Sequence, residues 1–222
     1  MISTIYEDFY QSAIIAPKNA KMILRHSLRD KIPPNDMGND ILLTREGEVM
    51  AEHFGRHCNL NLSHIHTSVV ERCRQTASLL AKGYQQTHKI SLPITPTHIL
   101  TDSYINNLDK AVKLFKTHSP YWIMSAFLRG ETLDGMRNVN ESMRLLFDYI
   151  FKNQIDNGME VFVTHDTFLI AIVCFCHNIQ PELDDFSWPY MLEGAFLYLE
   201  NEQINCIFRG KTKSIPFDFN VK

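Results

Sequence analysis

Short apolar runs and longer amphipathic stretches alternate along the 222 residues of this chain. The run "AKMILR" at residues 20–25 is apolar without alternation, as expected of a strand that is buried on both faces of a parallel sheet. Three more runs predict strands, namely "SHIHTS" at 63–68, "LPITPTHIL" at 92–100 and "MEVFVTH" at 159–165.

Apolar residues at helical spacing predict helices between these strands. Residues 2–15 show this spacing, and Pro17 closes the segment. Ser68 and Glu71 have the spacing of a capping box for a helix that continues to about Ala81. The other predicted helices cover residues 45–58 after an N-cap at Thr44, 141–152, and the apolar run 168–176.

The last part of the chain has a different pattern. The stretch "GAFLYLENEQINCIFRG" at 194–210 alternates around an Asn-Glu-Gln turn and predicts an antiparallel hairpin. Strands that alternate with helices make an α/β protein with a mostly parallel sheet, to which this hairpin adds an antiparallel edge. The loop at 30–40 contains two prolines and residues typical of turns, so it is free to border a site.

Composition and charge narrow the class of protein. The formal net charge of -3 provides no general attraction to nucleic acid or to an anionic membrane, so any positive site must be a local cluster. The five cysteines are scattered in the pattern of reduced, mostly buried thiols. The first ten residues do not resemble a secretory signal, and the apolar run 168–176 is too short to cross a bilayer. We therefore predict a soluble cytoplasmic protein that binds neither membranes nor nucleic acid.

Charged side chains gather where predicted strands end, which is where α/β proteins place their sites. Arg25, His26 and Arg29 follow the first strand, and His165 and Asp166 follow "EVFV" at 160–163. Arg72 lies one turn into a helix after "IHTS". Neighbouring cations lower the pKa of an imidazole, so the arginines keep His26 mostly neutral at pH 7 and free to act as a nucleophile.

Three arginines and a second histidine suit a phosphoryl group. Guanidinium groups hold phosphate oxygens in pairs and stabilise the charge spread over them in the transition state. A neutral His26 could attack phosphorus and become a phosphohistidine, which water then hydrolyses. A carboxylic acid must protonate the departing oxygen and afterwards activate that water.

Four segments resemble the histidine phosphatase superfamily, which includes the cofactor-dependent phosphoglycerate mutases and the histidine acid phosphatases. They are "LRHSLR", "LLTREGEVMA", "TSVVERCRQTA" and "VFVTHDTFL", in the family's order. The resemblance implies that His26 is the nucleophile and that Arg25, Arg29, Arg72 and His165 form the phosphate pocket. It also implies one domain over residues 1–222, a three-layer sandwich with helices on both faces of the sheet, and a small helical cap inserted at about 103–138.

The chain departs from the family pattern at two places. Ser27 replaces the glycine that usually follows the nucleophile, and its hydroxyl could crowd the turn or contact the phosphate. The acid is the second departure. The mutase-like branch uses a glutamate after the third strand, where this chain has Asp102, whereas the acid phosphatase branch uses the aspartate after the second histidine, here Asp166. We favour Asp166 because "HDT" resembles the second branch, and keep Asp102 as the alternative.

We predict a phosphomonoesterase that acts on a small phosphorylated substrate without a metal or organic cofactor. A phosphoglycerate mutase-type transferase and a non-catalytic phospholigand-binding scaffold remain alternatives. The pairs His53 and His57 and His64 and His66 have spacings that could hold a transition metal, but exposed histidine pairs are common. We expect Cys174 and Cys176 in the core, and the stretch 119–130 in the core of the cap, with Arg129 or Arg137 as a less favoured contact for a second anionic group.

Overall fold

The computed structural model of the chain describes residues 9, 11–33, 36–152, 158–179 and 188–218. A seven-stranded sheet runs through the middle of the molecule with the strand order β3-β2-β4-β1-β5-β6-β7. Its strands are β1 (Lys21–Arg25), β2 (Leu62–Ser68), β3 (Ile94–Thr97), β4 (Met159–Thr164), β5 (Gly194–Glu200), β6 (Gln203–Phe208) and β7 (Lys211–Pro216). The first four strands in this order are parallel, and β5, β6 and β7 add antiparallel pairings. The predicted α/β class with an antiparallel edge is confirmed.

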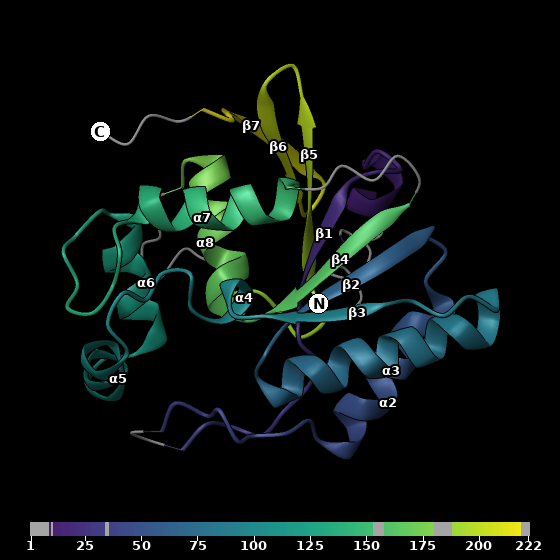
Figure 1. The fold of residues 1–222 in the computed structure, drawn as a ribbon, viewed down its shortest axis with the longest axis horizontal. Helices are drawn as coiled ribbons and strands as arrows, with labels where there is room; N and C mark the ends of the chain where they lie inside the picture. The colour runs from purple at the N-terminus through teal and green to yellow at the C-terminus, as the bar shows by residue number, and fades with distance from the viewer. Residues whose placement is uncertain (1–8, 10, 34–35, 153–157, 180–187, 219–222) are drawn as a thin grey trace.

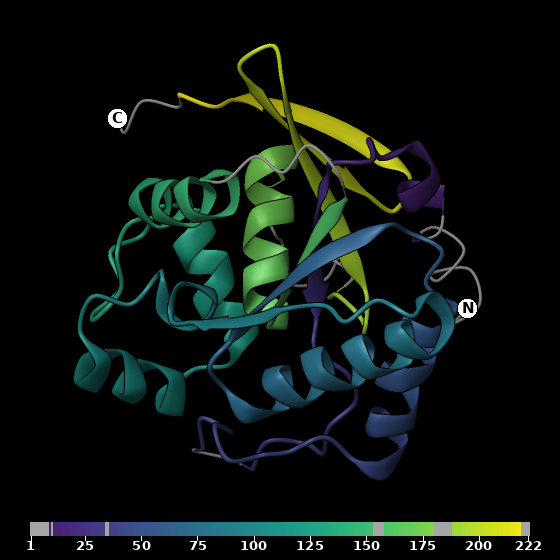
Figure 2. The same ribbon diagram turned by 45° about the vertical axis from the view of Figure 1, so that its right-hand side comes forward.

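Helices cover both faces of the sheet (Figures 1 and 2). They are α2 (Arg45–His57), α3 (Glu71–His88), α4 (Ile99–Asp102), α5 (Leu108–Thr117), α6 (Pro120–Leu128), α7 (Val139–Phe151) and α8 (Asp166–His177). The face with α2 and α3 buries Met22 and Leu24 of β1, and the face with α7 and α8 buries Ile23. Because both faces of β1 are buried, its sequence shows no alternation.

The register of the parallel strands brings the site together. Arg25, the last residue of β1, pairs with Thr164, the last residue of β4. Thr67 of β2 pairs with Val163 of β4, so these three strands end at the same edge of the sheet. The residues that follow them in sequence, including His26 and His165, therefore start from one side of the molecule.

Two sequence-based expectations were wrong in detail, and a third, the antiparallel hairpin at 194–210, is confirmed as β5 and β6. Ser68 is the last residue of β2 and forms no capping box, because the N-cap of α3 is Val70 and has no side-chain cap bond. The second half of "LPITPTHIL" is not a strand, since Ile99 begins the short helix α4 that ends at Asp102. The predicted hairpin is part of a three-stranded unit. The sequence of β7 gave no signal because its residues are almost all exposed.

Other expectations shifted or fall partly outside the described residues. Helix α3 continues to His88 rather than Ala81, and α8 begins at Asp166 rather than 168. Of the helix expected at 2–15, residues 9 and 11–15 are helical, and residues 1–8 and 10 lie outside the described part of the chain. Among the described residues, no helix is long and apolar enough to span a membrane.

The stretch 103–138, called the cap segment below, holds α5 and α6 on the α7 and α8 side of the sheet (Figure 1). The 30–40 loop precedes α2 in the chain and extends beneath the sheet toward α5, as both ribbon views show. Residues of this loop and of α5 line one cavity together. The loop and the cap segment are therefore neighbours in space although about 70 positions separate them in the sequence.

Candidate active site

His26 is the first residue beyond β1 and is almost completely buried, with 1% of its surface exposed. Its Nδ1 lies 2.7 Å from the carbonyl oxygen of Ser27. A carbonyl can only accept, so Nδ1 carries the proton and donates it to this oxygen. The other ring nitrogen, Nε2, is left with its lone pair, and it accepts a hydrogen bond from Nε of Arg72 at 3.1 Å.

Burial and neighbouring cations keep this ring neutral. Burial lowers the pKa of His26 most, and His165, Arg72 and Arg25 lower it further. The hydrogen bond to the Ser27 carbonyl acts in the opposite direction, but the pKa of His26 stays well below its usual value. At neutral pH the Nε2 atom is therefore an unprotonated nitrogen that can attack an electrophile once Arg72 no longer covers it.

Arg72 connects the two histidines. Besides its bond to His26, one terminal nitrogen donates to Nδ1 of His165 at 3.1 Å, and the other donates to the carbonyl oxygen of Gly38 in the 30–40 loop. Since Nδ1 of His165 accepts, its Nε2 carries the proton and donates to Oγ of Ser68 at 3.0 Å. Burial first, and then Arg72, lower the pKa of His165, so both histidines are neutral.

Arg25 is held from two sides. Its terminal nitrogens donate to a carboxylate oxygen of Asp166 at 2.6 Å and to the carbonyl oxygen of Pro189. Its Nε is buried and has no hydrogen-bond partner among the described residues. This Nε is therefore an unsatisfied buried donor, and Arg25 itself does not line the cavity described below.

The segment "WPYMLEG" at 188–194 supports this arrangement. Trp188 forms a side-chain hydrogen bond with Asp166, and its ring packs 4.2 Å from that of Tyr121 in the cap segment. Glu193 is buried and pairs with Arg209 at 2.6 Å, and its carbonyl accepts the N–H of Arg25 at 2.9 Å. The segment therefore fixes both the backbone and the carboxylate partner of Arg25.

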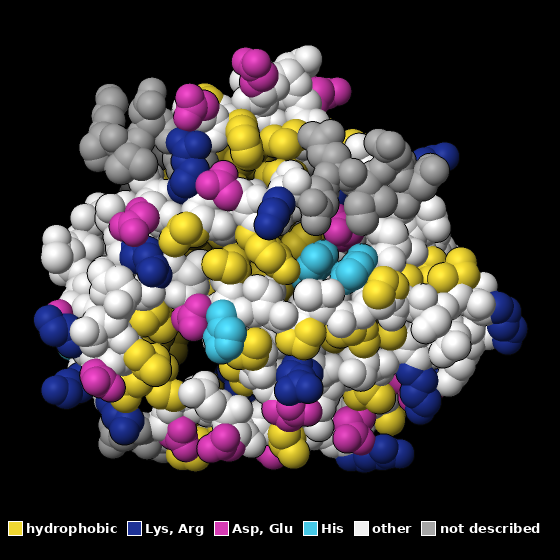
Figure 3. Space-filling model, viewed as in Figure 1, with side chains coloured by type: hydrophobic (Ala, Val, Ile, Leu, Met, Phe, Trp, Pro, Cys, Tyr) yellow, Lys and Arg dark blue, Asp and Glu magenta, His cyan; other side chains and the backbone are white. Residues whose placement is uncertain are grey.

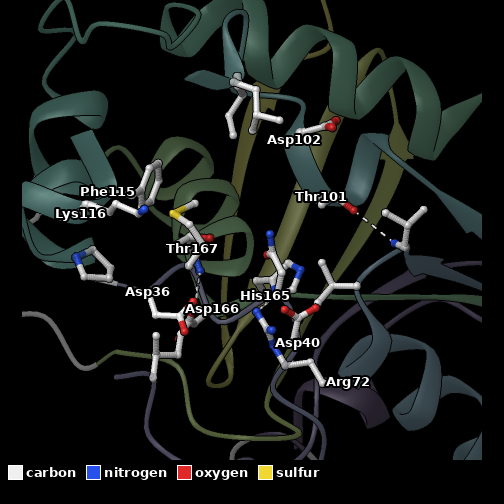
Figure 4. A pocket seen from close by; sticks show the side chains of 18 of the residues that line it. Asp36, Asp40, Arg72, Thr101, Asp102, Phe115, Lys116, His165, Asp166 and Thr167 are labelled. Atoms are coloured by element: carbon white, nitrogen blue, oxygen red, sulfur yellow. Dashed lines mark hydrogen bonds between the residues drawn. The ribbon is translucent and has the colours of Figure 1, made fainter. Parts of the chain in front are cut away.

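The two candidate acids have different surroundings. Burial would raise the pKa of Asp166, but Arg25 and the bonds from Trp188 and the Thr167 N–H lower it below its usual value. Asp166 is thus a carboxylate paired with an arginine. Asp102 lies at the end of α4 with a side chain 44% exposed and 3.6 Å from His98, on the wall of the pocket above His165 (Figure 4).

Ser27 does not face the pocket. Its hydroxyl donates to the carbonyl oxygen of Gly47 at 2.7 Å, and its N–H donates to Oγ1 of Thr76 at 3.0 Å. The residue is completely buried, so the structure does not bring the expected phosphate contact of this hydroxyl to the site. Gly47 permits this close packing, because a Cβ there would lie 2.0 Å from the carbonyl oxygen of Leu28. The glycine of the "LLTREG" segment thus permits the close packing of the turn that follows His26.

A cavity of about 770 Å³ opens beside these groups. We call the part lined by Arg29, Arg72, His165 and Asp166 the arginine end. Arg29 is half-buried there, and its Nε has no partner among the described residues. The opposite part, lined by α5 and by the 30–40 loop, is called the cap end. In Figure 4, Phe115 and Lys116 of α5 lie across the pocket from Arg72.

Several supporting residues were not singled out from the sequence. Ser68 binds His165 and Thr101, and Thr76 anchors the turn after His26. Arg72 and Thr76 are four positions apart and lie on one face of α3, so the "TSVVERCRQTA" segment did contain the signal for this side of the site. Cys73 lies 3.7 Å from Nε2 of His165, but burial raises its pKa to about 12, so it remains an unreactive thiol.

The candidate metal pairs do not form larger clusters. The rings of His53 and His57 lie 3.9 Å apart on α2, while His66 binds Tyr149 and Glu160. In the described part of the chain, no group of three or more histidine, cysteine, aspartate or glutamate side chains could hold a metal ion.

The remaining predictions concern the core and the cap segment. Cys174 and Cys176 are buried, as expected of core residues. Arg129 pairs with Glu131, and Arg137 donates to the carbonyls of Ser103 and Ile105. Neither arginine lines the cavity, so the less favoured contact to a second anionic group is wrong.

The fold and the site define an α/β protein with a buried histidine bound by an arginine at the carboxyl edge of a parallel sheet. Residues 23–191 match the family model of the histidine phosphatase superfamily (branch 1). The chain belongs to this superfamily, which confirms the resemblance of its four segments. A comparison with curated protein sequences found no significant match.

Solved structures share the fold at low sequence identity. YhfR of Bacillus stearothermophilus superposes with a TM-score of 0.61 at 13% identity, covering 86% of this chain and 96% of that one. A phosphoserine phosphatase from Entamoeba histolytica in complex with 3-phosphoglyceric acid gives 0.56 at 15%, covering 91% and 97%. A mycobacterial glucosyl-3-phosphoglycerate phosphatase gives 0.54 at 15%, covering 81% and 92%. At these identities the likeness establishes the fold alone.

Proposed function

We propose that this protein is a phosphomonoesterase that transfers the phosphoryl group of its substrate to Nε2 of His26. The observation that supports this most strongly is the tautomer of His26. Its Nδ1–H donates to the Ser27 carbonyl, and the lone pair on its Nε2 accepts a hydrogen bond from Arg72, which lines the cavity. A residue that only packs in the core needs no such arrangement.

The reaction has two steps. A phosphate dianion takes over N–H groups of Arg72 that now bind His26 and Gly38, and it meets the unpartnered Nε atoms of Arg25 and Arg29. Nε2 of His26 then forms a bond to phosphorus while the bond from phosphorus to the ester oxygen breaks. Water later attacks the phosphohistidine, which breaks the bond to nitrogen and releases inorganic phosphate.

We assign the acid to Asp102 rather than to the aspartate favoured from the sequence. A general acid must carry a proton, and Arg25 holds Asp166 as a carboxylate. Asp102 lines the cavity, is paired with no arginine or lysine among the described residues, and follows the third strand, where the mutase-like branch has its glutamate. In the first step it protonates the leaving oxygen, and in the second its carboxylate takes a proton from the attacking water. Asp166 positions Arg25.

An assay with an aryl phosphate tests the proposed function. The wild-type protein should release phosphate, and His26→Ala should abolish the release while the variant remains folded. If the purified protein is inactive at acid and neutral pH but still binds vanadate, the scaffold alternative holds. If it interconverts phosphoglycerates faster than it hydrolyses them, the mutase alternative holds. The phosphatase names of the structural neighbours favour hydrolysis.

A further inference from the structure

Helix α5 presents two large apolar side chains, Leu108 and Phe115, to the cavity. An amphipathic helix normally packs its apolar face against the rest of the protein. Of the ten residues of α5, Ala111 is the one that is fully buried. Leu108 is 63% exposed although it is a large apolar residue, and it lines the cavity together with the partly buried Phe115. Phe115 packs partly against the core, whereas Leu108 leaves most of its apolar surface uncovered beside the cavity.

The opposite wall of the cap end is also apolar. Ile32, Pro33 and Met37 of the 30–40 loop line the same cavity as Leu108 and Phe115. In Figure 3 the surface at the lower left, over α5 and this loop, is hollowed and bordered by hydrophobic side chains. Two apolar walls that face one space favour an apolar guest between them.

This space is continuous with the reaction centre. The same cavity of about 770 Å³ is lined by Arg72 and His165 at one end and by Leu108 at the other. A phosphoryl group occupies a small part of such a volume, which lies in the range of pockets for drug-sized ligands. A substrate anchored by its phosphate at the arginine end therefore extends its leaving group toward the cap end.

The charges of the lining disfavour a second anion. In the described lining, the arginines and lysines are Arg29 and Arg72 at the arginine end and Lys116 at the cap end. Asp36 and Asp40 line the cavity on the side of Lys116. A carboxylate on the leaving group would meet these acidic side chains, and like charges at short range are repulsive.

We propose that the substrates are phosphomonoesters whose leaving group is bulky, apolar and free of negative charge. This inference rests on the proposed function and adds the class of alcohol that is released. Selectivity comes from Leu108 and Phe115 on one side and from Ile32 and Met37 on the other, which together enclose the leaving group.

A series of alkyl phosphates from methyl to hexyl phosphate tests this, because the leaving alcohols have similar intrinsic reactivity. The value of kcat/KM should rise at least about tenfold along the series, since each added methylene enters an apolar site. The hexyl chain that ends in a carboxylate should lose this gain. Leu108→Asp should flatten the rise, whereas Val49→Asp, at an exposed apolar position on α2 that does not line the cavity, should preserve it.

The outcomes separate the two proposals. If no ester releases phosphate, the proposed function fails. If the esters are hydrolysed at equal rates, or if the carboxylated chain is preferred, the proposed phosphatase function stands. The proposed preference for an apolar leaving group is then wrong. If Leu108→Asp leaves the rise unchanged, the leaving group does not contact α5.

Discussion

The two ends of the cavity differ in the interactions that hold their side chains. At the arginine end, Arg72 and His165 are buried and bind each other, and Arg72 also binds His26, which does not itself line the cavity, so each side chain has one defined position. At the cap end, Leu108 and Phe115 are exposed or partly buried and have no directional bonds through their side chains. Hydrogen bonds fix a geometry, whereas apolar contacts accept many shapes. The first end therefore suits the chemistry that all substrates share, and the second suits the part that differs between them.

Removal of Arg72 should produce the largest effect, and it should affect all substrates alike. Arg72→Ala removes the guanidinium that binds the phosphoryl oxygens, so we expect kcat/KM to fall by about 10²- to 10³-fold for methyl and hexyl phosphate equally. Steady-state assays with both esters measure this. Arg74→Ala is the matched control, because Arg74 lies on the same helix in an exposed ion pair with Glu71. A loss confined to the hexyl ester would contradict the division between the two ends.

We expect the general acid to lie between the two ends of the cavity. The dependence of kcat on the leaving group shows which aspartate it is. Asp102→Asn should lower kcat for alkyl esters by about 10²-fold, because an alkoxide needs a proton to depart. The loss should be smaller for nitrophenyl phosphate, since nitrophenolate leaves without one. Asp166→Asn should lower kcat for both substrates by a similar factor, because Asp166 acts through Arg25. If Asp166→Asn instead shows the dependence on the leaving group, the acid is Asp166.

The buried histidines should also make stability depend on pH. In the unfolded chain, His26 and His165 bind protons below about pH 6.5, whereas in the folded protein their pKa values are lowered. The unfolded state then holds more protons, so the free energy of unfolding falls as the pH drops below about 6.5. His26→Asn should reduce this slope by up to about 1.4 kcal/mol per pH unit below about pH 6.

Urea unfolding at several pH values measures this slope. Ile123→Val in the core of α6 is the control, because it should lower the stability by about 1 kcal/mol at every pH and leave the slope unchanged. An identical slope in His26→Asn and the wild-type protein would show that His26 titrates alike in the folded and unfolded states. The prediction that His26 stays neutral at acid pH in the folded protein would then be wrong.

The sequence was most informative about the arginine end. His26 and His165 directly follow strands, and Arg72 lies in the first turn after one, so an alternation of strands and helices was enough to bring them to one edge. The direction of Ser27 was not predictable, because it depends on the carbonyl of Gly47, which comes from a different element. Likewise, the ion pair between Asp166 and Arg25 was not predictable, because it depends on their positions in three dimensions.

The cap end was less accessible to sequence reasoning. The family resemblance implied a helical cap at 103–138 but not that Leu108 faces a cavity, since apolar periodicity has the same form whether the partner is a core or a ligand. The strand β7 was missed because its side chains are exposed and show no alternation. Sequence patterns report burial, and both features lie where burial is low.

A rapid-quench experiment tests the central claim most directly. The protein is mixed with nitrophenyl phosphate, quenched in alkali, digested and analysed by mass spectrometry, because a phosphohistidine survives alkali but not acid. We expect one phosphoryl group on the peptide that contains His26, formed within the first turnover and absent from His26→Ala. Sustained release of phosphate with no phosphoryl group on His26, or with the group on another residue, would contradict covalent catalysis by His26.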